Sequence, residues 1–166
     1  MKTRYGRPVY EINPFLEGIE DKIITQTKEL VSNINLVGSN DETIIGTSTS
    51  NSNYKSLNYL QVTDDWIDCM LEFTSNGNVA AWITVLFMYE INHKAINRDF
   101  LFLPYEQVIE ISKLFNKSVP SRSTFSRGLN KMYEKNMIAN HYYGNSWYWF
   151  NLAMMFNGNI GKIIKG

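Results

Sequence analysis

Cysteine and histidine are scarce in this 166-residue sequence, and both shortages narrow what the chain can be. The single cysteine, Cys69, excludes an intramolecular disulfide and disfavours a cysteine-based metal site. The two histidines, His93 and His141, lie far apart, and neither has a carboxylate at a spacing that marks a site. The sequence also has no glycine-rich phosphate loop and no GxSxG motif. We therefore expect neither an enzyme nor a bound cofactor or metal.

A long hydrophobic segment is missing as well. Residues 1–13 contain no apolar signal region, so we expect a cytoplasmic protein. Residues 79–91 are apolar almost throughout, but this run is shorter than the roughly 20 residues of a membrane span. A helix that is apolar on all sides is buried on all sides. The run therefore predicts either a central helix or part of a homodimer interface, and we favour the central helix.

The chain also lacks net charge, with 16 basic and 16 acidic residues, which by itself argues against a nucleic-acid partner. The distribution of these charges along the chain, however, favours a nucleic-acid partner. Residues 91–166 contain ten Lys or Arg and four Asp or Glu, a formal charge of +6, and residues 1–90 carry −6. Because binding to a polyanion depends on the local patch, the basic half remains a candidate for binding nucleic acid.

An acidic cluster lies in the negative half of the chain. Asp64, Asp68 and Glu72 recur four residues apart, with Asp65 beside them, and so share one face of a helix. This pattern fits a divalent-metal site or the N-terminus of a helix, whose dipole favours acids. We favour the helix N-terminus, with Thr63 as its cap, because no histidine or second acidic motif converges on the cluster.

The composition divides the chain into two parts. Residues 1–58 are predicted to form an N-terminal arm and a polar linker, because residues 38–58 are dominated by Ser, Thr, Asn and Gly. Basic residues at the start of this arm (Lys2, Arg4 and Arg7) are candidates for contacting DNA as a flexible arm. Residues 59–166 are predicted to form a folded domain.

Within that domain, residues 100–151 predict a specific order of elements. A short apolar strand (100–103) precedes a helix (105–115), a polar turn (116–120) and a second helix (121–135). Two strands follow, at 137–143 and 146–151, joined by a two-residue turn at Gly144-Asn145. This order predicts an α+β fold, a winged helix-turn-helix with an N-terminal extension.

The second helix indicates the function. Phe125, Leu129, Met132 and Tyr133 share one face by their spacing and should pack inward. The opposite face carries hydroxyls, an amide and cations, the groups that read base edges and bind phosphates in a major groove. The predicted DNA contacts of this helix and the turn before it are Lys117, Ser121, Arg122, Ser123, Thr124, Ser126, Arg127, Asn130 and Lys131.

The hairpin that follows is predicted to act as the wing. Its tip residues, His141, Tyr142, Tyr143 and Asn145, are expected to reach phosphate or the minor groove. A solvated polar helix in an ordinary α+β unit would explain the helix alone. The combination of helix, turn, basic helix and wing favours DNA binding.

The same region resembles a known group of proteins. Residues 121–129 (SRSTFSRGL) are similar to the recognition helix of many winged-helix proteins. The stretch from Asn151 through Met155-Phe156-Asn157-Gly158 resembles the tail of plasmid and phage replication initiators of the Gram-positive winged-helix type. Asn13-Pro14-Phe15 and residues 42–47 (ETIIGT) are similar to that group too, whereas the usual Asn-Pro after the wing is Asn151-Leu152 here.

This resemblance, which covers mainly residues 80–158, implies binding to a replication origin and recruitment of host replication proteins. The residues themselves predict only sequence-specific binding of double-stranded DNA, by a monomer or a homodimer and away from the membrane. A transcriptional regulator on the same fold, and a protein-interaction module that uses the aromatic wing, remain alternatives.

Overall fold

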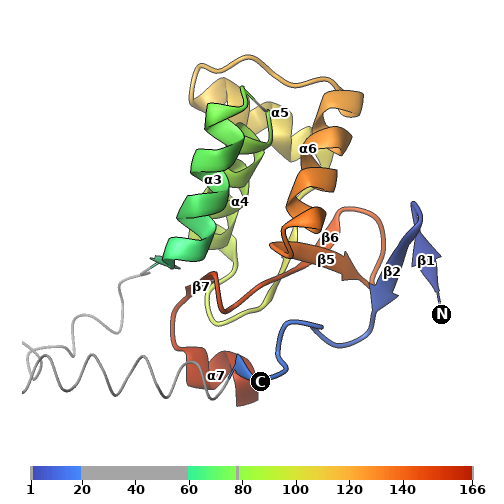
Figure 1. Ribbon diagram of the computed structural model, residues 1–166, viewed down its shortest axis with the longest axis vertical. Coiled ribbons are helices and arrows are strands. Elements are labelled where there is room, and N and C mark those ends of the chain that lie inside the picture. The colour runs from blue at the N-terminus through green and yellow to red at the C-terminus, as the bar shows by residue number, and fades with distance from the viewer. Residues whose placement is uncertain (1, 20–59, 78, 166) are drawn as a thin grey trace, which may run out of the picture.

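The computed structural model describes residues 2–19, 60–77 and 79–165 and confirms an α+β fold (Figure 1). The predicted polar linker at residues 38–58 lies outside these ranges. The helices are α3 (Asp64–Ser75), α4 (Ala80–Lys94), α5 (Tyr105–Leu114), α6 (Arg122–Glu134) and α7 (Ile160–Lys165). The strands are β1 (Thr3–Arg4), β2 (Arg7–Tyr10), β3 (Leu60–Val62), β4 (Phe100–Phe102), β5 (Ile138–His141), β6 (Trp147–Phe150) and β7 (Met155–Asn157).

Helix α4 is the centre of the core, as its apolar sequence predicted. It packs against α3 on one side and α6 on the other, and Ile83, Leu86 and Phe87 are completely buried. The close approach of α6 depends on Gly128, because a Cβ atom there would lie 2.1 Å from Cδ1 of Ile83. Burial of this apolar helix therefore fixes the position of α6.

The strands form a five-stranded sheet in the order β1-β2-β5-β6-β4 and a separate β3–β7 pair. Strands β4, β6 and β5 are antiparallel, with Phe102 opposite Trp147 and Ala139 opposite Trp149. Strand β2 joins them in parallel with β5, Val9 pairing with Asn140. Residues from the predicted N-terminal arm thus extend the sheet that carries the hairpin.

Two details of the predicted elements are wrong. The β5–β6 connection comprises residues 142–146 rather than two residues, and a positive φ angle occurs at Ser146 as well as at Gly144. Thr63 does occupy the N-cap position of α3, but its hydroxyl does not cap the helix and instead donates to the carbonyl of Met154 at 3.0 Å. That bond connects the start of α3 to the β3–β7 pair.

Candidate nucleic-acid interface

Helix α6 has the two faces that its spacing predicted. Phe125, Leu129 and Met132 are buried, and Tyr133 is half-buried at the edge of the core. The other face is open to solvent along the length of the helix. Its exposed residues are Arg122, Ser123, Ser126, Arg127, Asn130 and Lys131, followed by Glu134 in the last turn.

The helix begins at a well-formed cap. The backbone N–H of Thr124 donates to Oγ of Ser121 at 3.2 Å, which satisfies one of the free donors of the first turn. The Ser121 hydroxyl also donates to Oγ1 of Thr124 at 2.8 Å. These two predicted contact residues therefore have a structural task, which is to fix where the exposed face begins.

The cations on and around α6 differ in their partners. Arg122 pairs with Glu106 at 3.4 Å, and Lys131 pairs with Glu134 at 3.6 Å, all four side chains being well exposed. Such exposed pairs are weak, so they present little obstacle to an incoming phosphate. Arg127 has no carboxylate partner within the described residues, and its guanidinium donates to Oγ1 of Thr124 at 3.2 Å. Arg127 is therefore the most available cation of the face.

The β1–β2 hairpin lies beside β5 (Figure 1) and carries two arginines, Arg4 and Arg7. Arg7 lies with its guanidinium 4.6 Å from the ring centre of Tyr133 and donates to Oδ1 of Asn130 at 3.4 Å. The hydroxyl of Tyr133 in turn donates to Asn140 on β5, and burial raises the pKa of this phenol. Stacking and hydrogen bonding thus hold the hairpin against the second half of the helix.

Arg4 connects the same hairpin to the wing. Its guanidinium donates to the backbone carbonyls of His141 and Gly144. Together α6, the hairpin and the wing enclose a groove of about 590 Å³. Its lining includes the predicted contacts Arg122, Ser126, Asn130 and Asn145, joined by Arg4, Tyr5 and Arg7. The sequence predicted Arg4 and Arg7 as basic residues of a flexible arm, but it did not predict that they lie beside the helix.

His141 is not the exposed wing-tip residue that the sequence predicted. Its side chain is 1% exposed, its ring centre lies 4.0 Å from that of Trp149, and its Nδ1 accepts from the N–H of Tyr143 at 3.1 Å. Burial, and secondarily the charge of Arg4, lower the pKa of His141 to about 4. The imidazole is therefore neutral near pH 7 and packs inside the sheet, and it is not exposed at the wing tip.

Tyr142 and Tyr143 are exposed, but the structure separates them from the groove. Both rings contact His141, and Tyr143 also contacts Trp147 with ring centres 5.2 Å apart. Tyr148, which lies between Trp147 and Trp149 on β6, packs on Phe87 of α4, on the helix side of the sheet. Because side chains alternate along β6, Trp147 lies on the face opposite to Tyr148, away from the helices. The ring contacts with His141 and Trp147 place the two tyrosines on that face. Of the predicted wing contacts, Asn145 alone lines the groove.

Lys117 lies in the turn between α5 and α6 and is exposed. Its backbone N–H donates to the carbonyl of Ser112 at 2.8 Å, which helps to hold the turn. The residue does not line the groove, but it lies close in sequence to the start of α6.

Within residues 2–19, 60–77 and 79–165, no three His, Cys, Asp or Glu side chains gather in a way that could hold a metal ion. None of the helices in those ranges is long and apolar enough to cross a membrane. Comparisons with protein-family models, with curated proteins and with solved structures found no match to this chain.

Proposed function

We propose that this protein is a winged-helix protein that binds double-stranded DNA in a sequence-specific manner through the exposed face of α6. The observation that carries the proposal is the composition of that face. From Arg122 to Lys131 it presents three basic residues, two serines and an asparagine, and no carboxylate. An α-helix fits the major groove of B-DNA, where such side chains reach base edges and phosphates.

The arrangement around α6 supports the proposal. The element order α4, β4, α5, α6, β5 and β6 supports a winged helix, in which α6 would be the recognition helix. Arg4, Arg7 and Asn145 flank it across the groove. In this account Asn130 reads a base edge, and Arg127 contacts a base edge and the phosphates beside it. The flanking groups and Lys117 bind phosphates, which set position without reading sequence.

We further propose that the DNA is a plasmid or phage replication origin, with host replication proteins as partners. This part rests on the resemblance of residues 80–158 to replication initiators of the Gram-positive winged-helix type. A transcriptional regulator is the second candidate, and it predicts an altered promoter output with unchanged plasmid copy number. A homodimer that reads two half-sites about one helical turn apart also stays a prediction.

The test of DNA binding is the salt dependence of affinity for a labelled random duplex, measured by fluorescence anisotropy. The slope of log K against log salt is negative, and each lost phosphate contact makes it shallower by about 0.9. We expect Arg127→Ala to weaken binding and to make this slope shallower. Lys162→Ala is the matched control, because it removes an exposed cation from α7, at the other end of the molecule (Figure 1).

If Arg127→Ala and Lys162→Ala both bind duplex as tightly as the parent at every salt concentration, α6 is not the DNA-binding helix. If the parent shows no salt-dependent binding at all, the proposed function is wrong as a whole. Circular dichroism of each variant establishes that the fold is intact before the affinities are compared.

A further inference from the structure

The sheet face away from the helices is covered with aromatic rings. Because side chains alternate along a strand, Phe100 and Phe102 of β4 lie on the same face as Trp147 and Trp149 of β6. Phe102 and Trp147 have ring centres 4.8 Å apart, and Phe100 lies 6.0 Å from Trp147. Tyr143 extends the group from the wing. These rings form one continuous surface, here named the aromatic face.

A large part of the aromatic face is open to solvent. Phe102 is 44% exposed, Tyr143 is 56% exposed and Tyr142 is 43% exposed, while Phe100 and Trp147 are half-buried. His141 and Trp149 are buried beneath them and support the layer. A contiguous exposed aromatic surface of this kind is uncommon on a protein that binds nothing there.

Cations border the aromatic face at the β4 edge. A cavity of about 270 Å³ is lined there by Phe100, Phe102 and Trp147 together with Lys94, Arg98 and Gln107, and no carboxylate of the described residues lines it. The guanidinium of Arg98 lies 5.8 Å from the ring centre of Phe100. Positive charge and exposed rings therefore meet at a single concave site.

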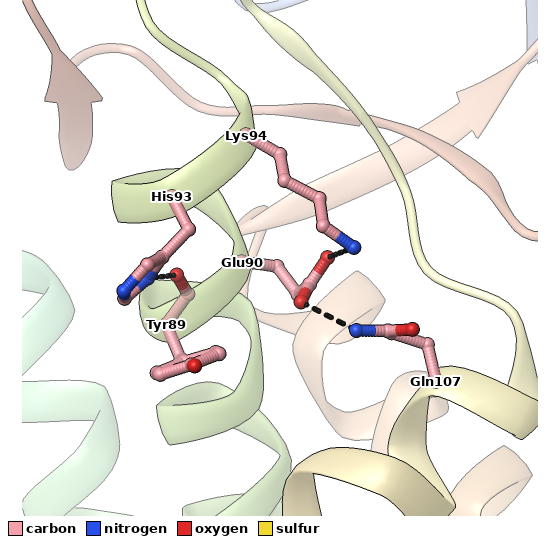
Figure 2. Close-up of polar contacts among 5 residues, drawn as sticks. All are labelled: Tyr89, Glu90, His93, Lys94 and Gln107. Carbon is pink, nitrogen blue, oxygen red and sulfur yellow. Dashed lines mark hydrogen bonds and ion pairs between the residues drawn. The ribbon is translucent and has the colours of Figure 1, made fainter.

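A buried carboxylate holds part of this lining in place. Glu90 on α4 is completely buried, with one oxygen 3.0 Å from Nζ of Lys94 and the other accepting from Nε2 of Gln107 at 3.1 Å. Figure 2 shows Lys94 and Gln107 converging on Glu90, while His93 turns to the other side, toward Tyr89. Because Lys94 is paired, Arg98 is the freer of the two cations.

Among the described residues, neither Asp99 nor Glu11 lines the cavity. The carboxylate of Asp99 accepts from Nδ2 of Asn13 at 3.1 Å. Glu11 acts electrostatically on Tyr142, at the far end of the aromatic face from Arg98. A polyanion that enters at the Arg98 edge therefore meets cations first and rings next.

We propose that the aromatic face binds single-stranded DNA, with bases stacked on Phe102, Trp147 and Tyr143 and the backbone held at Arg98. Exposed rings beside cations are the combination by which proteins bind single strands without reading sequence. The aromatic face and the α6 groove are on opposite sides of the sheet, so one molecule can hold duplex and an unpaired strand together. The choice of DNA over RNA rests on the function proposed above.

The experiment is a titration of a labelled oligothymidylate of about 12 nucleotides, a length within the range that single-strand-binding domains cover. Phe102→Ala and Tyr143→Ala should each weaken binding by roughly 5- to 150-fold, the effect of losing one stacked base. Arg98→Ala should weaken it and reduce its salt dependence. Leu114→Ala is the control, because Leu114 is an exposed apolar residue, 66% exposed, on α5. It should bind as the parent does.

Measuring duplex binding by the same variants distinguishes a failure of this inference from a failure of the proposed function. Phe102→Ala should keep the parent's affinity for duplex, and Arg127→Ala should keep the parent's affinity for oligothymidylate. If oligothymidylate fails to bind while duplex binds, the aromatic face is a protein-docking surface and the inference alone is overturned. If duplex fails to bind while oligothymidylate binding depends on Phe102 and Arg98, the inference stands and the proposed function falls.

Discussion

His141 contributes a pH dependence to stability that follows from its burial. Its folded pKa of about 4 lies below the ordinary value near 6.5, so the unfolded chain binds more protons between these two pH values. Stability therefore rises with pH across this window and falls when the solution is acidified through it. The physical cause is that the protonated imidazolium would be desolvated among aromatic rings and close to Arg4.

We predict that His141→Phe flattens this pH dependence, since a phenylalanine ring keeps the stacking but cannot take a proton. The measurement is urea unfolding of the parent and the variant at pH 4.5, 5.5 and 7. An equal decline of both proteins between pH 7 and pH 4.5 would place the titrating group elsewhere. Asp99, whose pKa is raised by burial, is retained in both proteins and cancels in the comparison.

Asn130 is the residue on α6 that we expect to carry sequence discrimination. Asn130→Ala should narrow the difference in binding free energy between a selected site and random duplex by about 1–3 kcal/mol. Asn145 lies on the wing side of the groove. Asn145→Ala should weaken binding to the selected site and to random duplex by similar factors, because phosphate contacts carry no base identity. Site selection from random duplexes followed by competition binding gives both differences. Equal losses for the two variants would remove Asn130 from base reading.

For individual residues of α6, the sequence predicted which side chains are buried and which are exposed, because helical spacing alone decides this division. It did not predict the burial of His141. That burial depends on Trp149 and on the folding of Tyr142 and Tyr143 over the outer sheet face, contacts that spacing along the chain does not encode.

Among the elements, α6 depends most on one neighbour, since Gly128 lets it lie close against Ile83. Gly128→Ala places a methyl group where Cδ1 of a fully buried isoleucine now lies. Overpacking costs about 1–3 kcal/mol and outweighs the gain of at most about 1 kcal/mol in helix propensity. We predict a net loss of about 1 kcal/mol, and at most about 2 kcal/mol, in the free energy of unfolding.

The double variant Gly128→Ala with Ile83→Val tests the cause. Valine lacks the Cδ1 atom that clashes, so the pair should lose less stability than the two single variants added together. Strict additivity in chemical denaturation would contradict a steric contact between these residues.

The elements from 100 to 150 could be predicted to within a few residues because their periodicities are strong. The hairpin turn could not, although Gly144-Asn145 is a common two-residue signal. The chain instead uses residues 142–146, which places Tyr142 and Tyr143 on the sheet face away from the helices. Tertiary packing of aromatic side chains decided the connection, rather than local turn preference.

For the whole molecule, the unexpected feature is the N-terminal hairpin in the sheet. Strand β2 lies parallel to β5, and the carbonyl of Tyr10 accepts from Nε1 of Trp149 at 2.9 Å and from the N–H of Tyr142 at 3.1 Å. Pairing between segments about 130 residues apart leaves no periodic trace, so the sequence indicated only a basic arm.

We predict that deleting residues 1–11 lowers the thermal midpoint and weakens duplex binding. The deletion exposes the edge of β5, removes the partner of Trp149 and takes Arg4 and Arg7 from the groove. Differential scanning calorimetry and anisotropy check the two effects. A truncated protein as stable as the parent, with the same affinity for duplex, would show that the hairpin is a dispensable tail.

An amide NMR titration of the 19.3 kDa protein with duplex tests most directly whether α6 is the DNA-binding element. We expect the largest shift changes on residues 121–131, on Asn145 and Ser146, and on the β1–β2 hairpin. Changes concentrated on α3 and α7, with α6 unaffected, would contradict it.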